Sequence, residues 1–290
     1  MLQIQYIRDN HQEVVERLKI KNFDAEAIVE QVMAIDNLRR ESQKLLDETL
    51  AKSNKIAKEI GMLFKSGKQQ EADELKAITT ELKKITQDLG EKLGAYKSDM
   101  EDLLVKIPNL PHHSVPAGKS SDDNELILEE SFDINLEDDA LPHWELATKY
   151  DIIDFELGSK VSGAGFPFYK GQGARLQRGL INFFLEEALN AGYIEYQPPL
   201  MVNEDSAFGT GNLPDKDGQM YHVGDDNLYL IPTAEIPLTN IYRDTILKAE
   251  DLPIKIAAYS SCFRREAGSY GKDVRGLNRL HQFDKVEIVQ

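Results

Sequence analysis

The sequence has very little cysteine. Its single cysteine, Cys262, cannot form a disulfide within the chain and leaves no cysteine cluster that could ligate zinc. A lone cysteine among polar neighbours is compatible with a nucleophile. Because free cysteine usually behaves as a small apolar residue, we interpret Cys262 as a structural residue of a strand.

Long apolar segments are also absent. No apolar run is long enough to span a bilayer, and Met1 to Phe23 has neither the basic start nor the apolar middle of a signal peptide. Hydrophobic residues make up 41% and charged residues 29% of the 290 residues, which is typical of a soluble globular protein with room for two domains. We therefore expect a cytoplasmic protein.

Positive charge is scarce overall. The chain has 34 Lys and Arg against 50 Asp and Glu, a formal net charge of −16, which argues against nonspecific binding of nucleic acid by the whole surface. Neither DNA nor a membrane is an expected partner. Much of the imbalance lies in residues 122–139, which contain many acids and no Lys or Arg. A local basic patch is still compatible with the sequence, because the sign reverses near the carboxyl end: Arg264, Arg265, Lys272, Arg275, Arg279 and Lys285.

Two long helices are predicted in the amino-terminal third. Asp24 can cap a helix in which apolar residues recur at steps of three and four over residues 28–63, until Ser66 and Gly67 interrupt the pattern. A second series follows over residues 75–103. Two such seams with a short turn between them predict an antiparallel coiled-coil hairpin. Helices of roughly 37 residues would make an arm about 55 Å long, and its mixed charges indicate solvated faces rather than a catalytic site.

A segment rich in proline and glycine, Ile107 to Gly118, must end the second helix. We therefore predict an arm at residues 1–106, a linker at 107–118 and a globular domain at 119–290. The adjacent His112 and His113 have no other His or Cys at ligand spacing, so a metal site is not expected there.

The globular part mixes α and β patterns. A helix is predicted from Gly173 to Gly192, followed by a strand, Tyr193 to Val202, that contains Pro198 and Pro199. Because proline lacks a ladder donor, this strand should lie at a sheet edge or at an interface. A dimer interface and an ordinary monomeric core both fit this pattern.

No phosphate-binding loop is present. The pair Gly163 and Gly165 lacks the third glycine of a dinucleotide fingerprint, and Lys272 is followed by Asp273 where a P-loop needs Ser or Thr. Any ATP must therefore bind in another way.

A β-hairpin is predicted near the carboxyl end, with strands at Ile256–Glu266 and Leu280–Val289. Side chains alternate across a strand, so one face should be apolar and suited to burial. The other face should present a guanidinium, two carboxylates and an aromatic ring: Arg264, Glu266, Glu287 and Phe283. Such a face could bind a ligand that is both anionic and aromatic, or its charges could merely pair with one another in solvent.

A second candidate lies in Leu228–Asn240, where an apolar strand is followed by Thr233 and Glu235 and then by a helix near Pro237. A carboxylate beside a helix start can simply interact favourably with the helix dipole. The residues alone favour this interpretation over a binding role.

In combination, these motifs resemble a known family. FRRE at 263–266, RGLNRLHQFDKVE at 275–287, TAEIPLTN at 233–240 and the helical arm together resemble bacterial-type seryl-tRNA synthetases, which are class II aminoacyl-tRNA synthetases. The resemblance implies an α+β fold, with an antiparallel coiled-coil arm followed by a class II catalytic domain built on an antiparallel β-sheet. It also implies a homodimer formed through the region Gly173–Val202, which resembles class II motif 1.

The implied activity is that of a serine-tRNA ligase in translation. Serine and ATP, with Mg²⁺, would form seryl adenylate, and the seryl group would pass to the 3′ end of tRNA(Ser), and also of tRNA(Sec). The arm would grip the tRNA.

Residue roles follow from the same resemblance. Arg264 is the implied catalytic residue, binding the α-phosphate and the serine carboxylate, while Phe283 stacks on adenine and Glu266 contacts its edge. The implied ATP-binding set is Arg264, Arg265, Glu266, Arg279, Leu280 and Phe283. The implied serine-binding set is Thr233, Ala234, Glu235 and Glu287. Lys272 and Arg275 would contact the tRNA acceptor stem, and no metal ligand is identified.

The family pattern continues beyond this sequence, with further strands and a motif 3 that carries another ATP-binding arginine and metal-binding acids. The sequence reaches Gln290 within a predicted strand. We therefore expect an amino-terminal portion of a synthetase that does not form seryl adenylate by itself. Two alternatives stay open: a noncatalytic tRNA-binding or scaffold protein built on the arm, and a ligase that charges a carrier protein with serine, which should lack the arm.

Overall fold

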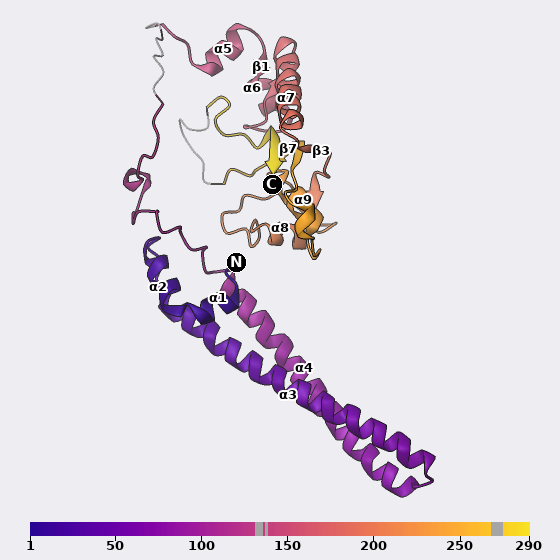
Figure 1. Cartoon of the computed structure of the whole chain (residues 1–290). Helices are drawn as coiled ribbons and strands as arrows, with labels where there is room; N and C mark the ends of the chain where they lie inside the picture. The colour runs from indigo at the N-terminus through magenta and orange to yellow at the C-terminus, as the bar shows by residue number, and fades with distance from the viewer. Residues whose placement is uncertain (131–135, 137–138, 268–274) are drawn as a thin grey trace. The chain divides into compact units, whose positions relative to one another are not determined.

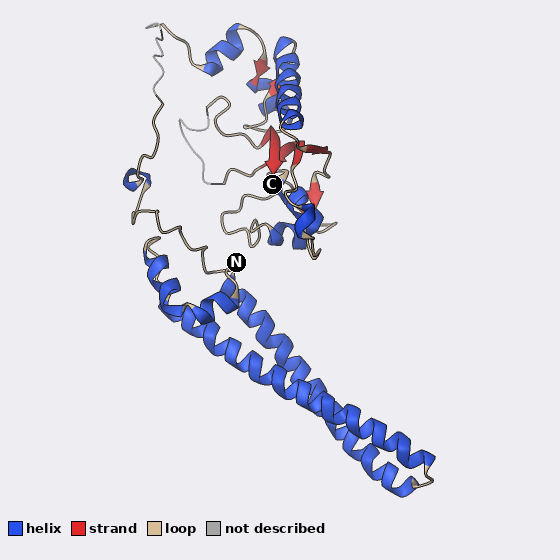
Figure 2. Cartoon of the chain, in the orientation of Figure 1, coloured by secondary structure: helices blue, strands red, loops and turns tan. Residues whose placement is uncertain are grey.

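The computed structural model describes residues 1–130, 136, 139–267 and 275–290. The chain divides into two compact units, Met1–Phe132 and Asp133–Gln290. The first is a long helical hairpin and the second mixes helices with short sheets (Figures 1 and 2). Within the described residues, no helix has the length and apolar character needed to cross a membrane.

The first unit is almost entirely helical. Its elements are α1 (Ile4–Asp9), α2 (His11–Lys19), α3 (Glu26–Lys65), α4 (Gln69–Leu104) and the 3-10 turn η1 (Ser121–Asp123). Helices α3 and α4 contain 40 and 36 residues and pack together along their length. The turn between them contains Gly67 at φ +75°, a left-handed conformation that glycine adopts without strain. The predicted coiled-coil hairpin is confirmed.

The predicted cap of the first long helix is wrong. Helix α3 begins at Glu26, its N-cap is Ala25 rather than Asp24, and no side chain caps it. Ala25 is fully buried in a core with Leu18 of α2 and Val29 of α3. Packing of α2 against the start of α3 therefore positions this helix end, instead of a local hydrogen bond.

A buried ion pair lies at the base of the arm. Asp36 is 0% exposed, and each of its two carboxylate oxygens receives two hydrogen bonds from one guanidinium. Arg8 of α1 donates to Oδ2 at 3.0 and 2.7 Å, and Arg39 donates to Oδ1 at 3.1 and 2.7 Å. Burial alone would raise the pKa of Asp36, but the hydrogen bonds from Arg39 and Arg8 outweigh it and hold that pKa below its ordinary value of 3.8.

We expect Asp36→Asn to lower the free energy of unfolding of the arm by about 3 kcal/mol, because it leaves two guanidinium groups without their carboxylate. Since the folded pKa is lowered, the stabilisation is present above the unfolded value near pH 4 and is lost as the pH falls through the folded pKa. Urea unfolding followed by helical circular dichroism at pH 7 and pH 3 measures this. The exposed pair of Asp73 with Lys76 provides the control, Asp73→Asn, which should cost less than about 0.5 kcal/mol. Equal costs for the two variants at pH 7 would contradict the assignment.

The second unit contains short helices, short strands and one long hairpin. Its helices are α5 (His143–Lys149), α6 (Phe155–Val161), α7 (Gln172–Asn190), α8 (Glu204–Gly209), α9 (Glu235–Thr239), η2 (Asn240–Tyr242) and η3 (Ala249–Asp251). Its strands are β1 (Ile153–Asp154), β2 (Phe168–Tyr169), β3 (Ile194–Tyr196), β4 (Met201–Val202), β5 (His222–Val223), β6 (Leu228–Leu230), β7 (Ile256–Phe263) and β8 (Gln282–Val289).

Three small sheets are formed by the described strands, in the orders β1-β2, β3-β7-β8 and β4-β6-β5. Strand β3 runs parallel to β7, and β7 and β8 pair antiparallel over eight residues each, from Ile256 opposite Val289 to Phe263 opposite Gln282. Helix α7 packs against this hairpin. The predicted antiparallel sheet after the arm is confirmed.

The prolines divide the strand predicted from Tyr193 to Val202. Strand β3 ends at Tyr196, and β4 begins at Met201 in a different sheet. The single strand was a wrong prediction because Pro198 and Pro199 cannot donate to a ladder. The expected edge position is correct, since β3 pairs with β7 alone among the described strands.

One face of the hairpin is less apolar than predicted. Tyr259 and Ser261 donate hydrogen bonds of 2.8 and 3.0 Å to Oδ1 of Asp284, and Gln177 of α7 donates to Oδ2 of the same carboxylate. Burial, followed by the bond to Asp284, raises the pKa of Tyr259. A carboxylate network, rather than apolar packing alone, therefore joins α7 to the hairpin.

Candidate active site

The register of the hairpin places three chemically useful side chains on one face. Phe283, Lys285 and Glu287 alternate along β8 and therefore lie on one face. Cys262, Ser260 and Ala258 of β7 lie directly opposite them and share that face. This face is the one opposite the Asp284 network.

A polar cluster forms where this face meets the start of α9. The buried Thr233 donates its hydroxyl proton to Oε2 of Glu287 at 2.6 Å. The same hydroxyl oxygen accepts hydrogen bonds from Nζ of Lys285 at 2.9 Å and from the backbone N–H of Glu235 at 3.2 Å. Lys285 and Glu287 also form an ion pair. The structure thus brings Thr233 and Glu287, which lie 54 residues apart, into direct contact.

The other residues of the TAE loop are placed differently. Ala234 is fully buried in the core beneath the hairpin, so its side chain is not presented to solvent. Glu235 is the first residue of α9 and is exposed, which leaves its carboxylate accessible to a ligand. The helix predicted near Pro237 begins two residues earlier than expected.

Sequence reasoning missed Lys285 as a site residue. It was noted only as one of several basic residues, yet it alternates with Phe283 and Glu287 on the same strand. The alternation that identified those two residues could have identified Lys285 as well.

The second half of the site pairs a guanidinium with an aromatic ring. The Arg264 guanidinium carbon lies 5.0 Å from the centroid of the Phe283 ring, a cation–π distance. The Arg264 backbone N–H donates to the carbonyl oxygen of His281 at 3.0 Å, one step beyond the β7–β8 ladder. The His281 ring is itself held by stacking on Phe166 at 5.2 Å and by a 2.8 Å hydrogen bond to the Tyr221 hydroxyl. Arg264 and Phe283 are therefore adjacent on a supported backbone.

Glu266 does not belong to the strand, contrary to prediction. Strand β7 ends at Phe263, and Glu266 has φ +47°, so its position does not follow from strand alternation. The chain leaves the ladder because the Arg265 N–H donates instead to the carbonyl of Gln219 at 2.8 Å. Glu266 nevertheless lies near another expected ATP ligand, since Arg279 approaches its carboxylate at 3.4 Å.

Two further members of the expected ATP set differ in exposure. Arg265 is exposed and is anchored through its backbone, whereas Leu280 is 7% exposed. Leu280 can therefore offer a ligand little beyond its backbone.

Arg275, one of the two expected acceptor-stem contacts, packs against α5. The Arg275 guanidinium carbon lies 4.8 Å from the Trp144 ring, and the Leu277 N–H donates to Nε2 of His143 at 2.8 Å. Gly276 between them has φ +73°, and a Cβ there would lie 2.1 Å from the His143 ring. The other expected contact, Lys272, lies outside the described residues.

Cys262 is a structural residue, as interpreted. It is fully buried between the strands, and burial raises the pKa of its thiol, which disfavours the nucleophilic thiolate. Over the described ranges of the chain, no group of three or more His, Cys, Asp or Glu side chains is arranged to hold a metal ion.

The part of the chain that contains this hairpin and Thr233 matches a known family. The family description "tRNA synthetase class II core domain (G, H, P, S and T)" matches residues 221–290, which contain both halves of the site. The fold of this part is therefore that of a class II aminoacyl-tRNA synthetase core. A second description, "Seryl-tRNA synthetase N-terminal domain", matches residues 1–111.

Similarity to individual proteins narrows the class. The chain is 46% identical over 290 residues to a serine--tRNA ligase of Salinibacter ruber, with all of this chain and 68% of the relative covered. It is 47% identical over 294 residues to the serine--tRNA ligase of Chlorobium luteolum, with the same coverage. The chain belongs to the seryl-tRNA synthetase family.

Two solved structures of the same family resemble this chain in fold. The seryl-tRNA synthetase of Pyrococcus horikoshii, solved in complex with ATP, matches with a TM-score of 0.83 and 32% identity over 99% of this chain and 69% of that chain. The cytoplasmic serine-tRNA ligase of Naegleria fowleri, solved with AMP, matches with a TM-score of 0.77 and 25% identity over 99% of this chain and 66% of that one.

Proposed function

We propose that this protein activates serine with ATP to form seryl adenylate and transfers the seryl group to the 3′ end of tRNA(Ser), and of tRNA(Sec), in translation. The observation that carries the proposal is the contact of Thr233 with Glu287 on the hairpin face that also presents Arg264 and Phe283. The cluster can hold a small amino acid, and the adjacent pair can hold a nucleotide.

Serine recognition is proposed for the Thr233 cluster. The Glu287 carboxylate can accept hydrogen bonds from an ammonium or a hydroxyl group, and the exposed Glu235 carboxylate adds a second acceptor. Lys285 compensates the charge of Glu287 and lies within reach of the same hydroxyl. A buried set of polar groups of this kind rejects an amino acid that lacks the matching hydroxyl, because the protein groups would be left unpaired.

ATP recognition is proposed for Arg264, Phe283 and their neighbours. The Phe283 ring offers a face for adenine, and the forked guanidinium of Arg264 suits a phosphate. Because Arg264 now lies over the ring, stacking of adenine on that face requires the guanidinium to move towards the phosphates. Glu266 and Arg279 approach each other at 3.4 Å and can contact the nucleotide beside the ring.

The chemistry of the first step needs positioning and charge stabilisation. Serine's carboxylate is ionised at neutral pH, so its oxygen can attack the α-phosphorus without a general base while the bond to pyrophosphate breaks. Arg264 stabilises the negative charge that develops on the phosphoryl oxygens. In the second step a ribose hydroxyl of the tRNA attacks the seryl carbonyl carbon and AMP leaves. Mg²⁺ is proposed to accompany ATP, and among the described residues no group of three or more His, Cys, Asp or Glu side chains is arranged to hold it.

Residues 1–106 form the tRNA-binding arm, 107–118 the linker and 119–290 the catalytic part, with Lys272 and Arg275 facing the acceptor stem. The protein acts in the cytoplasm.

A homodimer through Gly173–Val202 is also proposed. It is supported by large apolar side chains that are exposed on α7 and β3, including Leu176 at 60%, Phe183 at 55% and Ile194 at 63%. Exposure of this many apolar side chains on neighbouring elements is typical of an interaction surface. Sedimentation equilibrium of the purified protein should give twice the monomer mass.

The experiment that tests the proposed function is amino-acid-dependent exchange of pyrophosphate into ATP, followed by charging of tRNA(Ser). It uses the protein expressed from its complete reading frame. Serine should support both reactions. Binding of tRNA without exchange for any amino acid would instead favour a noncatalytic protein built on the arm, and transfer of serine to a carrier protein but not to tRNA would favour the other alternative.

A further inference from the structure

The two flanks of the arm differ in charge along α4. Residues seven apart on a long helix of a coiled coil lie on one stripe. One stripe carries lysines and a glycine: Lys76, Lys83, Gly90 and Lys97. A second stripe is acidic apart from one alanine: Glu74, Glu81, Asp88, Ala95 and Asp102. All three lysines of the first stripe are exposed.

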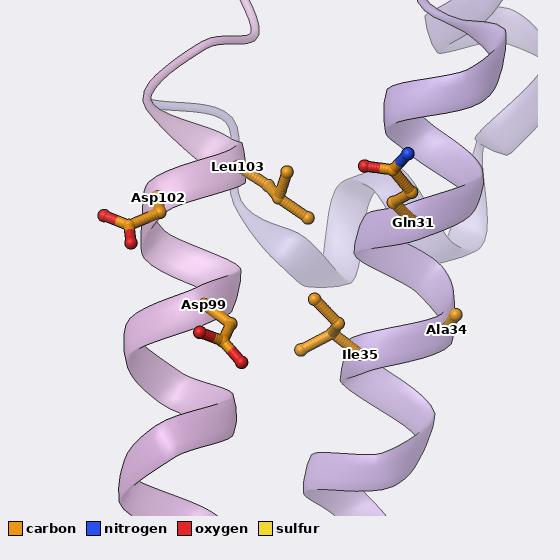
Figure 3. Close-up of a pocket in the computed structure, with 6 residues that line it drawn as sticks. All are labelled: Gln31, Ala34, Ile35, Asp99, Asp102 and Leu103. Carbon is orange, nitrogen blue, oxygen red and sulfur yellow. The ribbon is translucent and has the colours of Figure 1, made fainter.

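The acidic stripe ends at a pocket in the base of the arm. This pocket, of about 380 Å³, lies between α3 and α4 and is lined by Gln31, Ala34, Ile35, Asp99, Asp102 and Leu103. Figure 3 shows the two carboxylates on α4, while Ile35 and Leu103 project into the space between the helices. A polyanion would be repelled along this flank.

The lysine stripe borders an uncharged stripe of α3. The Lys76 ammonium lies 4.5 Å from the centroid of the Phe64 ring, which places Phe64 on the same flank. Counting back from Phe64 in steps of seven gives the uncharged Ala57, Leu50 and Gln43 before it reaches the buried Asp36. Lys76 also forms an exposed ion pair with Asp73 at 2.8 Å, which a phosphate can replace.

Glycines on this flank leave the helix backbone open. Gly90 lies on the lysine stripe itself and Gly94 lies one turn further along α4, while Gly61 lies on α3 one turn before Phe64. Glycine is a poor helix former, so each position weakens the arm. A Cβ at any of the three would meet nothing within 4 Å, so packing within the described chain does not require them. A partner that approaches the helix backbone closely would require glycine at these positions.

We infer that the flank of the arm defined by Lys76, Lys83 and Lys97 is the face that binds tRNA, through its sugar-phosphate backbone, and that the acidic flank faces away. This inference rests on the proposed function, which assigns tRNA binding to the arm as a whole. Exposed lysines at regular spacing supply phosphate contacts, and the open glycines allow the ribose-phosphate chain to approach. Contacts of this kind position the nucleic acid without reading its bases.

Binding of fluorescently labelled tRNA(Ser) over a series of salt concentrations tests the face assignment. The first variant combines Lys76→Ala, Lys83→Ala and Lys97→Ala. It should weaken binding about 10- to 100-fold at about 0.1 M salt and lower the slope of log Kd against log salt by about three. The control combines Lys52→Ala, Lys55→Ala and Lys58→Ala, which removes the same charge from exposed positions of α3 and should weaken binding less than about threefold.

The outcomes separate the inference from the proposed function. Failure of the unaltered protein to bind tRNA(Ser) would overturn the proposed function, and the face assignment with it. Binding by the unaltered protein, with equal losses in the two triple variants or a larger loss in the control, would overturn the face assignment alone.

A second variant excludes a merely structural explanation. Gly90→Ala with Gly94→Ala should raise the unfolding temperature of the arm, because alanine favours the helix, and should still weaken tRNA binding about tenfold. Loss of affinity in a more stable arm is not expected from a structural role. Unchanged affinity in this variant would contradict a close approach of tRNA at these glycines.

Discussion

Arg264→Ala should lower serine-dependent pyrophosphate exchange about 1,000-fold or more, because a preorganised cation is lost where charge develops in the transition state. The loss should fall mainly on kcat, since the guanidinium acts on the reacting phosphate, while Phe283 still binds the base. Arg264→Lys keeps the charge but loses the planar fork, and should still cost about 100-fold. The measurement is the exchange rate over ranges of ATP and serine concentration, in the protein from the complete reading frame.

The control for this prediction is Arg243→Ala in the same unit. Arg243 is exposed and bonds to Ser206 and Asn240, outside the hairpin face. Its exchange rate should stay within about threefold of the unaltered protein, as for surface substitutions in general. Near-normal exchange by Arg264→Ala, or an equal loss in the control, would remove Arg264 from the catalytic role.

Glu287→Gln should have the second large effect, a fall in kcat/KM for serine of about 1,000-fold with little change in KM for ATP. The substitution keeps the shape of the side chain and one acceptor oxygen, but it removes the charge that pairs with Lys285 and replaces the second acceptor oxygen by an amide donor. The pair is only partly buried, with 32% and 19% of the two side chains exposed, so the expected loss rests on substrate recognition: a site built to hydrogen-bond a substrate group discriminates by about 10,000-fold when the match is lost. Steady-state exchange kinetics with serine and ATP varied separately check it.

Two controls define the origin of that loss. Glu250→Gln alters an exposed carboxylate that pairs only with a neighbouring surface lysine, Lys248, among the contacts described, and should leave kcat/KM within about threefold. Thermal unfolding shows whether Glu287→Gln is folded at the assay temperature. A rise in KM for ATP equal to that for serine would contradict the assignment of Glu287 to the amino acid.

The hairpin shows what alternation along a strand can predict. Phe283 and Glu287 were correctly placed on one face because both strands are regular over eight residues. The same alternation also places Lys285 on that face, although Lys285 was not predicted as a site residue. The rule failed at Glu266, where the Arg265 N–H bonds outside the ladder and the chain adopts a left-handed conformation. Strand ends depend on tertiary partners that a periodic pattern does not contain.

Long-range contacts account for the other differences. The contact of Thr233 with Glu287 joins segments 54 residues apart, so spacing alone could nominate both residues but could not bring them together. The Asp284 network was missed because a single carboxylate on an otherwise apolar face has no periodic signature. The arm was predictable because its seams repeat over many turns, whereas its start depends on burial of Ala25.

The most direct test of the serine and ATP assignment is calorimetric binding of two nonreactive adenylate analogues, seryl and alanyl sulfamoyl adenosine, to the protein from the complete reading frame. Both fill the nucleotide site equally, so their difference reports the Thr233 cluster alone. The seryl analogue should bind at least about 1,000-fold more tightly, because the alanyl analogue leaves polar groups of the cluster unpaired. Equal affinities for the two analogues would contradict it.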